Sequence, residues 1–289
     1  MSKPVRKAVF PVAGLGTRSL PATKAVPKEM LTVVDKPVLQ YAVEEAIEAG
    51  IEVFVFVTSR GKTALEDHFD QHFELYETLR KRGKEAQLKQ SQAAELPVGK
   101  YLFVRQPVPL GLGHAVWCAK EAIGDEPCAV LLPDEVFRHT PNVLKQMLAT
   151  YEQRGGNLVA VREVPAADTA KYGILDVEHD DGTVATMKGM VEKPKPEEAP
   201  SNLSIVGRYV LQPEIFAAIE KQGPGAGNEI QLTDAMAQLI GRQPFAGVRF
   251  EGDRFDCGDK AGFVAANIAF ALERDDLAPK VREAIAQYL

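Results

Sequence analysis

Residues 7–30 read KAVFPVAGLGTRSLPATKAVPKEM, an apolar run that passes directly into a loop-like stretch of glycines, prolines and charged side chains. Residues 7–13 have the length and composition of a buried strand, whereas residues 13–30 have neither a helical nor a strand period. Glycines in such a loop let backbone N–H groups approach a ligand closely. We therefore expect the loop to lie at the ligand-binding edge of a sheet.

Four further apolar runs of strand length alternate with stretches whose apolar residues have helical spacing. The runs cover residues 52–59, 100–106, 128–135 and 157–164, and the helical stretches cover residues 37–50, 112–124 and 141–156. This alternation predicts an α/β fold, with a mostly parallel sheet flanked by helices on both faces. Ligands of such sheets bind beyond the carboxyl ends of the strands.

The pattern changes after residue 165. Residues 172–194 alternate around a DDG turn and predict a hairpin, and residues 204–211 predict another strand with a helix from about Pro213. Residues 261–289 predict a helical tail in which Pro279 starts a second segment. The polar residues 81–100 predict an exposed insertion.

Composition excludes several classes of protein. The 289 residues are 45% apolar and 26% charged, which is typical of a soluble globular protein, and a net charge of −6 argues against a general nucleic-acid surface. We find no signal-peptide pattern near the N-terminus and no apolar stretch that could span a membrane. The three scattered cysteines fit neither a disulfide framework nor a CxxC site, so we expect a cytoplasmic protein without membrane contact.

Two familiar phosphate-binding motifs fail on the residues. A dinucleotide fingerprint needs glycine or alanine where Ser19 stands, and a Walker A loop needs glycine at Phe56, five residues before the GKT of residues 61–63. What remains is a Gly-rich loop that carries Arg18, Lys24 and Lys28, whose cations could neutralise phosphate oxygens. The alternative is an ordinary charged loop.

Two aspartates follow predicted strands. Asp134 ends the run LLPD, and Asp256 lies in RFDCGD. Magnesium takes one or two carboxylates together with phosphate oxygens, so the pair predicts a metal site. The alternatives are a helix N-cap for Asp134 and a turn residue for Asp256.

Glu192 and Lys193 end a predicted strand just before a proline, in VEKPKP. A solvated charge run is one interpretation. The other is a carboxylate for sugar hydroxyls beside an ammonium for a phosphate.

The motifs, taken in order, closely resemble one family, the bacterial UTP–glucose-1-phosphate uridylyltransferases among the sugar-1-phosphate nucleotidylyltransferases. The G-x-G-T-R-x-x-P-x-[ST]-K signature of the wider family is present, and PLGLGHAV and EIQLTDA look particular to the glucose–UTP branch. The matching segments are residues 10–31, 35–51, 105–116, 131–135, 171–175, 191–194, 207–211, 229–235 and 254–259.

The resemblance implies a Rossmann-like nucleotide-diphospho-sugar transferase fold and the reaction of UTP with glucose 1-phosphate to give UDP-glucose and pyrophosphate, with Mg²⁺ as cofactor. It implies a catalytic domain over residues 1–260, with a nucleotide-binding part of about residues 1–136 and a sugar-phosphate-binding part of about residues 137–260. The tail 261–289 is then a candidate interface of a homodimer or homotetramer.

The resemblance also implies roles for single residues, position by position. Arg18, Lys28 and Lys193 match residues that grip the triphosphate, the reacting phosphate and the sugar phosphate. Glu192 matches a residue at the glucose, and Asp134 and Asp256 match the magnesium pair. The other matched positions are Ala13, Gly14, Gln106 and Gly111 around the uracil and Gly173 and Gly207 around the glucose.

Small departures and rival functions remain. Ser19 stands where a larger apolar residue is common, and Asn228 where glycine is common. A thymidylyltransferase, or an enzyme for another hexose 1-phosphate, is the nearest alternative. A nucleotide-sugar-binding regulator without catalysis is the alternative from another class, and a dehydrogenase is a more distant one.

Overall fold

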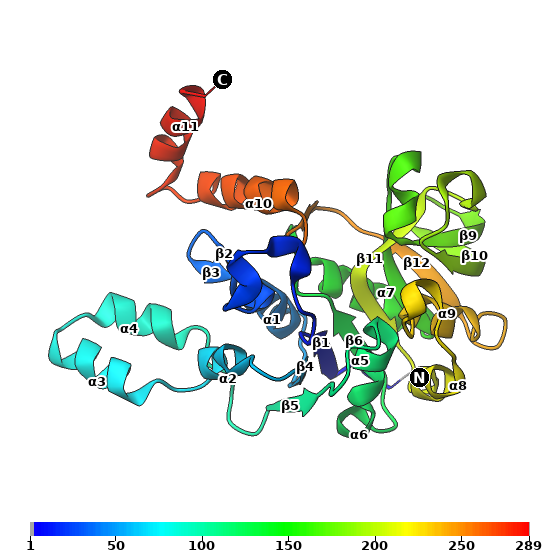
Figure 1. The fold of residues 1–289 in the computed structure, drawn as a ribbon, viewed down its shortest axis with the longest axis horizontal. Coiled ribbons are helices and arrows are strands. Elements are labelled where there is room, and N and C mark those ends of the chain that lie inside the picture. Colours follow the sequence, from blue (N-terminus) through cyan, green and yellow to red (C-terminus); the bar gives the residue numbers. More distant parts are fainter. Residues whose placement is uncertain (1–2, 289) are drawn as a thin grey trace.

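The structure, a computed structural model, describes residues 3–288 (Figure 1). The outer ends of the expected domains, residues 1, 2 and 289, lie outside the described residues. A nine-stranded sheet runs through the molecule in the order β5-β4-β1-β6-β11-β8-β12-β10-β9. Its strands are β1 (Lys7–Pro11), β4 (Val53–Thr58), β5 (Tyr101–Arg105), β6 (Cys128–Leu131), β8 (Asn157–Glu163), β9 (Gly173–Asp180), β10 (Val184–Glu192), β11 (Leu203–Leu211) and β12 (Phe245–Arg249).

The two halves of the sheet differ in strand direction. Strands β5, β4, β1 and β6 are parallel to one another, as the alternation of strands and helices predicts. Strand β11 lies antiparallel between β6 and β8, and β10 is antiparallel to both β12 and β9. Strand β8 pairs in parallel with β12. The predicted α/β class is confirmed, as are the five strands predicted before residue 165, but the fifth of them, β8, lies beyond antiparallel β11, so the sheet is mixed.

Helices cover both faces of the sheet because side chains alternate along its strands. Ala8, Phe10 and Phe56 pack with α1 (Val38–Glu48) and α7 (Val143–Arg154). Val9 and Val55, from the same strands, pack on the opposite side. The helices there are α5 (Leu112–Cys118), α8 (Glu214–Lys221) and α9 (Leu232–Ala237).

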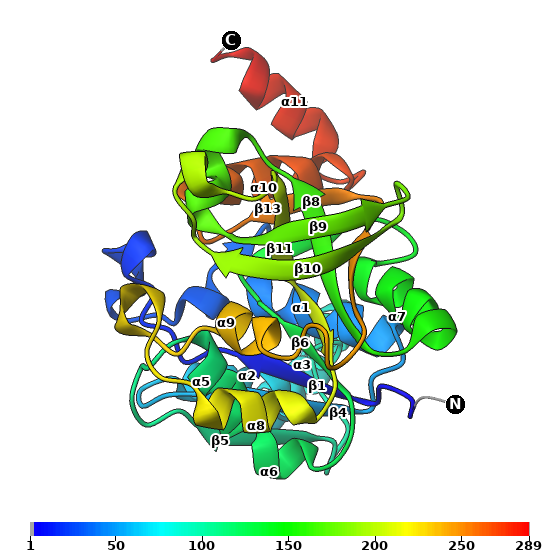
Figure 2. The ribbon, with the colours of Figure 1, turned by 90° about the vertical axis from the view of Figure 1, so that its right-hand side faces the viewer.

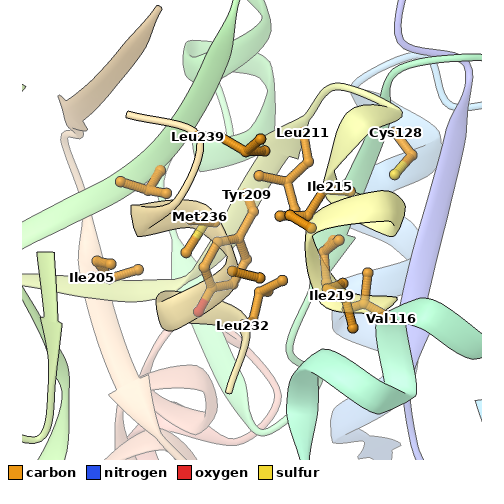
Figure 3. Packing of buried hydrophobic residues seen from close by; sticks show 14 of the residues in the cluster. Val116, Cys128, Ile205, Tyr209, Leu211, Ile215, Ile219, Leu232, Met236 and Leu239 are labelled. Atoms are coloured by element: carbon orange, nitrogen blue, oxygen red, sulfur yellow. The ribbon is translucent and has the colours of Figure 1, made fainter. Parts of the chain in front are cut away.

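The second of these clusters joins the two halves of the sheet. Figure 3 shows Tyr209 and Leu211 of β11 packed against Ile215 of α8 and Leu232 and Met236 of α9. The helix expected over residues 112–124 is present as two segments, α5 and the short α6 (Lys120–Ile123). A hydrogen bond of the 3-10 type, from the amide of Ala119 to the carbonyl of Val116 three residues earlier, marks the change between them.

Two segments extend from this body. Helices α2 (Thr63–Phe69), α3 (Phe73–Lys81) and α4 (Glu85–Gln92) form one arm, and residues 81–100 in it are mostly exposed, as expected (Figure 1). Helices α10 (Lys260–Leu272) and α11 (Ala278–Ala286) form the predicted tail, and α11 projects past α10 in both views (Figures 1 and 2). No helix among residues 3–288 is long and apolar enough to cross a membrane.

Short two-stranded sheets and 3-10 turns complete the fold. The sheets pair β2 (Thr32–Val33) with β3 (Lys36–Pro37) and β7 (Glu135–Arg138) with β13 (Asp253–Asp256). Short 3-10 turns lie at Thr17–Ser19, Ala22–Lys24, Lys28–Met30, Ala166–Lys171, Pro196–Glu198 and Ala226–Asn228.

Candidate active site

The loop after β1, residues 12–31, folds back on itself through three 3-10 turns. Gly16 has a φ of 69°, and a Cβ there would lie 3.0 Å from the Cβ of Lys28. The hydroxyl of Thr23 donates to the carbonyl of Gly16 at 2.6 Å, which closes the loop. Glycine is therefore required where the two ends of the loop meet, and this contact sets Lys28 over the N-terminal part of the loop.

A buried ion pair between Lys62 and Glu29 holds the start of the loop. The ammonium of Lys62 donates to the carbonyls of Val12 and Gly14 at 2.5 and 2.6 Å, and to the carboxylate of Glu29 at 2.8 Å. Both side chains of the pair are buried. Burial raises the pKa of Glu29 and lowers that of Lys62, so each charge depends on the other.

Sequence reasoning missed this pair. Lys62 belongs to the GKT that fails the Walker A test, and Glu29 was one charge among several in the loop. The sequence contained one signal, because Lys62 follows shortly after the buried strand β4. That strand pairs in parallel with β1, which precedes the loop.

Asp134 pairs with two of the three cations of the loop, Lys28 and Arg18. Its carboxylate lies 2.7 Å from the Nζ of Lys28 and 3.5 Å from an Nη of Arg18. Although burial alone would raise the pKa of Asp134, the Lys28 ammonium and the Arg18 guanidinium hold it below its ordinary value. For Lys28, burial opposes the charge, but Asp134 and Glu29 raise its pKa. The carboxylate and the ammonium are thus both charged at neutral pH.

The structure decides between the alternatives for the two aspartates. Strand β7, not a helix, follows Asp134, so the N-cap alternative is wrong for that residue. Asp256 does accept a hydrogen bond from the amide of Gly258 at 2.9 Å, as a turn residue would. Its carboxylate also lies on a cavity wall with Asp134, so the turn and a ligand role are compatible.

A cavity of about 480 Å³, here called the loop pocket, opens between this loop and the ends of β5 and α5. It brings together all four residues matched to the uracil, and it adds Arg18, Lys28 and Asp134. Its lining residues are Pro11, Ala13, Gly14, Leu15, Gly16, Thr17, Arg18, Ser19, Lys28, Gln106, Pro109, Gly111, Leu112, Ala115, Leu132, Asp134, Glu229 and Gly258.

Glycines form part of the wall of the loop pocket. Gly111 has a φ of 107°, and a Cβ there would lie 2.7 Å from the Cβ of Glu229 and 2.8 Å from the carbonyl of Ile230. The segment after β5 can therefore pass closely along the segment before α9 only with glycine at this position. Asn228, in the same facing segment, has a φ of 59°, a left-handed conformation that asparagine tolerates.

A second cavity, of about 530 Å³, lies beside the β9–β10 hairpin and is here called the hairpin pocket. It brings together Gly173, Glu192, Lys193, Gly207 and Asp256. The remaining lining residues are Arg18, Leu112, Leu132, Asp134, Glu135, Lys171, Tyr172, Ile205, Tyr209, Glu229, Gln231, Leu232 and Thr233.

Side chains at strand ends form the polar wall of the hairpin pocket. The hydroxyl of Thr233 donates to the carboxylate of Glu192 at 2.7 Å, and a Cβ on Gly173 would lie within 2.9 Å of that hydroxyl. The Nζ of Lys193 lies 3.3 Å from an Oε of Glu192, and Lys193 has a φ of 46°. Its side chain is 46% exposed, so the ammonium can also be reached by an anion that enters the pocket. Thr233 is a wall residue that sequence reasoning missed.

The two pockets adjoin. Five residues line both of them, namely Arg18, Leu112, Leu132, Asp134 and Glu229. A ligand that extends from one pocket into the other must pass Arg18 and Asp134. The junction therefore combines a cation and a carboxylate where two anionic groups could meet.

Two arginines with little exposure contact residues next to the junction. Arg208, fully buried, forms a bidentate pair with Glu45 and donates to the carbonyl of Leu132 at 2.9 Å. Arg254 pairs with Glu135, beside Asp134. Sequence reasoning missed both, although an arginine inside the apolar run SIVGRYVL was a signal for a buried pair.

The carboxylates fit a magnesium ion. Among residues 3–288 no group of three or more histidine, cysteine or acidic side chains is arranged as a metal site. Asp134 and Asp256 supply two carboxylates, and Asp134 is held ionised by its cationic neighbours. Mg²⁺ usually takes one or two carboxylates and completes its shell with water and phosphate oxygens, so this donor set is sufficient.

Comparison with known proteins shows the family of this chain. Residues 7–272 match the nucleotidyl transferase family. The chain is 54% identical over 260 residues to a UTP–glucose-1-phosphate uridylyltransferase of Komagataeibacter xylinus, an alignment that covers 90% of this chain and 92% of the relative.

Solved structures extend the similarity to the whole fold. A UTP-bound UGPase from Acinetobacter baumannii superimposes with a TM-score of 0.90 at 43% identity, covering 98% of this chain and 99% of the other. A UDP-glucose pyrophosphorylase complexed with UDP-glucose gives a TM-score of 0.83 at 42% identity, covering 93% of this chain and 100% of the other.

Proposed function

Because this chain belongs to the nucleotidyl transferase family, we propose that it transfers the uridylyl group of UTP to glucose 1-phosphate. The products are UDP-glucose and pyrophosphate. Relatives that share about half of its residues carry the name of this activity, and the similar solved structures include a UTP-bound and a UDP-glucose-bound protein.

The observation that carries the proposal is the pair of adjoining pockets. The loop pocket has backbone groups and a buried amide for a base, and the hairpin pocket has a carboxylate and an ammonium for a sugar phosphate. Arg18 and Asp134 lie where the two meet. A transfer between a nucleoside triphosphate and a sugar phosphate needs this adjacency, because both reactants must be held together and in line.

In the loop pocket, the backbone of Ala13 and Gly14 faces the uracil, while Gln106 and the backbone of Gly111 read its edge. Arg18 grips the triphosphate. The buried Lys62 supports these roles, since its ammonium fixes the carbonyls on either side of Ala13. The base is thus read by groups that are held in place before it binds.

In the hairpin pocket, Glu192 accepts hydrogen bonds from glucose hydroxyls and Lys193 holds the phosphate. Gly173 and Gly207 lie beside the glucose. A Cβ on Gly207 would lie 2.7 Å from the Cβ of Leu132, so this part of the wall has no space for a side chain. Thr233 holds the Glu192 carboxylate through a hydrogen bond.

The chemistry is an in-line substitution at phosphorus. A phosphate oxygen of glucose 1-phosphate attacks the α-phosphorus of UTP, the bond from that phosphorus to the α–β bridging oxygen breaks, and pyrophosphate leaves with the electron pair. Lys28 and Arg18 neutralise the charge that spreads over the phosphate oxygens. The chain supplies position and charge and forms no covalent bond of its own.

Asp134 and Asp256 would hold Mg²⁺. When bound, the ion supplies positive charge against the phosphate oxygens. Within the protein, Lys28 already balances Asp134 at 2.7 Å, so the carboxylate stays ionised before a metal arrives.

A homodimer or homotetramer formed through the tail is part of the proposal. Val264 and Ile268 of α10 are 57% and 38% exposed, and α11 projects away from the body (Figure 2). Exposed apolar side chains on one helix are typical of an interface between chains. Sedimentation of the wild type against Val264→Glu/Ile268→Glu tests this, since loss of the larger species is expected and an unchanged mass would contradict it.

We place the enzyme in the cytoplasm, where its three cysteines remain free thiols.

Initial-rate assays test the proposed reaction. With UTP, glucose 1-phosphate and Mg²⁺, pyrophosphate and UDP-glucose should appear in equal amounts, and excess chelator should stop both. Equal or faster turnover with dTTP would favour the thymidylyltransferase alternative, which the names of the relatives do not favour. Tight UTP binding without pyrophosphate release would favour a non-catalytic regulator.

A further inference from the structure

The side-chain amide of Gln106 has a defined orientation. Gln106 follows β5 and is 6% exposed, and its Nε2 lies 3.1 Å from the carbonyl oxygen of Gly111 and 3.1 Å from Nδ1 of His114. A carbonyl oxygen can only accept a hydrogen bond, so the Gln106 atom beside Gly111 must be the donating nitrogen. Both N–H bonds of the amide are then used, while no hydrogen bond among residues 3–288 uses Oε1.

His114 completes this arrangement from α5. Burial lowers the pKa of His114, so its imidazole is neutral at pH 7 and one ring nitrogen can accept. The ring stacks on Trp117 with 6.0 Å between centroids and 18° between planes, and its Nε2 lies 4.0 Å from the sulfur of Cys118. The ring therefore presents Nδ1 to Gln106.

We infer that His114 is a positioning residue for base selection, which holds the Gln106 amide so that Oε1 faces the base as a fixed acceptor. The inference rests on the proposed function. Uracil offers an N3–H donor to such an acceptor, whereas cytosine has an unprotonated N3 whose lone pair opposes it. Gln106 thus favours UTP over CTP, and it does so only while its amide cannot rotate.

Rotation of the amide by 180° is costly because of its two partners. It would place Oε1 against the Gly111 carbonyl and Nδ1 of His114, both of which accept, and both hydrogen bonds would be lost. Loss of His114 removes one of the two. Thymine has the same N3–H and O4 edge as uracil, so the orientation of Gln106 does not separate UTP from dTTP.

The test compares three nucleotides in one variant. His114→Phe keeps an aromatic ring against Trp117 and removes the acceptor. We expect the ratio of kcat/KM for UTP to that for CTP to fall about tenfold, which corresponds to one hydrogen bond, while the ratio for UTP to dTTP stays at the wild-type value. His114→Asn, whose Oδ1 can accept, should keep most of the preference for UTP.

Two controls separate orientation from packing. Trp117→Phe perturbs the same helix but leaves Gln106 and His114 in place, and its UTP to CTP ratio should equal that of the wild type. In a Gln106→Ala background, His114→Phe should change the ratio no further, because the amide it positions is gone. Calorimetric titration with UTP and CTP gives the same comparison without turnover.

A His114→Phe protein with an unchanged UTP to CTP ratio would overturn the inference, as would equal losses for UTP over CTP and UTP over dTTP. A wild-type protein that binds CTP as well as UTP would also overturn it. Failure of the proposed function looks different, since the wild type would then release no pyrophosphate and form no nucleoside-diphosphate glucose from any of the three nucleotides.

Discussion

The loop pocket and the hairpin pocket differ in how far their walls rely on backbone groups and on side chains. The wall of the first includes backbone at Ala13, Gly14 and Gly111, and Lys62, buried with its partner Glu29, holds the carbonyl of Gly14. The second places the side chains of Glu192 and Lys193 at the end of a strand.

This difference determines how each pocket can be damaged. A contact made by backbone cannot be removed by shortening a side chain, so the backbone contacts of the loop pocket are best tested at the residues that support them. A contact made by a side chain is lost directly with that side chain. Variants at a supporting residue, at the junction and at a contacting residue therefore test the comparison.

The largest effect is expected from Lys62→Met. It leaves the Glu29 carboxylate buried without its partner and frees two loop carbonyls, which should lower the free energy of unfolding by about 3–5 kcal/mol. Urea unfolding gives the value, and Lys89→Met on the exposed side of α4 is the matched control. A loss no larger than that of the control would show that the pair does not support the loop.

The double variant Lys62→Met/Glu29→Gln sharpens this result. Removing both charges should restore much of the stability, because no unpaired charge remains. Binding of UTP should stay weak, since nothing replaces the hydrogen bonds to the carbonyls of Val12 and Gly14. Recovery of UTP affinity together with stability would mean that the pair contributes to folding alone.

The next effect in size is expected from Asp134→Asn, at the junction of the pockets. The change removes the negative charge that faces Lys28 and one of the two carboxylates for Mg²⁺. Turnover should fall by roughly 10²–10³-fold, as for loss of a group that stabilises transition-state charge. Asp253→Asn, on the same short strand as Asp256 but paired with Arg138, should retain activity. Wild-type turnover in Asp134→Asn would exclude the assigned role.

The smallest effect is expected from Lys193→Met in the hairpin pocket. Loss of one charge-assisted contact should raise the KM for glucose 1-phosphate about 10–100-fold and leave the KM for UTP near its wild-type value. Lys188→Met, on strand β10 just before Lys193 and 64% exposed, serves as the control. A parallel rise in both KM values would show that the two pockets are not separate.

Much of the fold could be predicted because many of its strands and helices leave local patterns in the sequence. Apolar runs of strand length identified β1, β4, β5, β6 and β8, and the DDG turn identified the β9–β10 hairpin. The insertion of antiparallel β11 between β6 and β8 could not be predicted, since pairing between distant strands leaves no local period. The break between α5 and α6 could not be predicted either, because no proline or glycine lies at the junction.

The site divides in the same way. Arg18, Lys28, Asp134 and Lys193 could be named because charged side chains at strand ends are conspicuous, and the family resemblance supplied their roles. Lys62, Glu45 and Arg208 escaped because each is a single charge whose partner lies far along the chain. Their importance comes from burial, which only the folded structure reveals.

A crystal structure with UDP-glucose and Mg²⁺ tests the central claim most directly, because one ligand must occupy both pockets. The account predicts uracil in the loop pocket against Ala13 and Gln106, glucose in the hairpin pocket against Glu192, and the diphosphate between Arg18 and Asp134. Uracil in the hairpin pocket, or glucose outside it, would contradict the account.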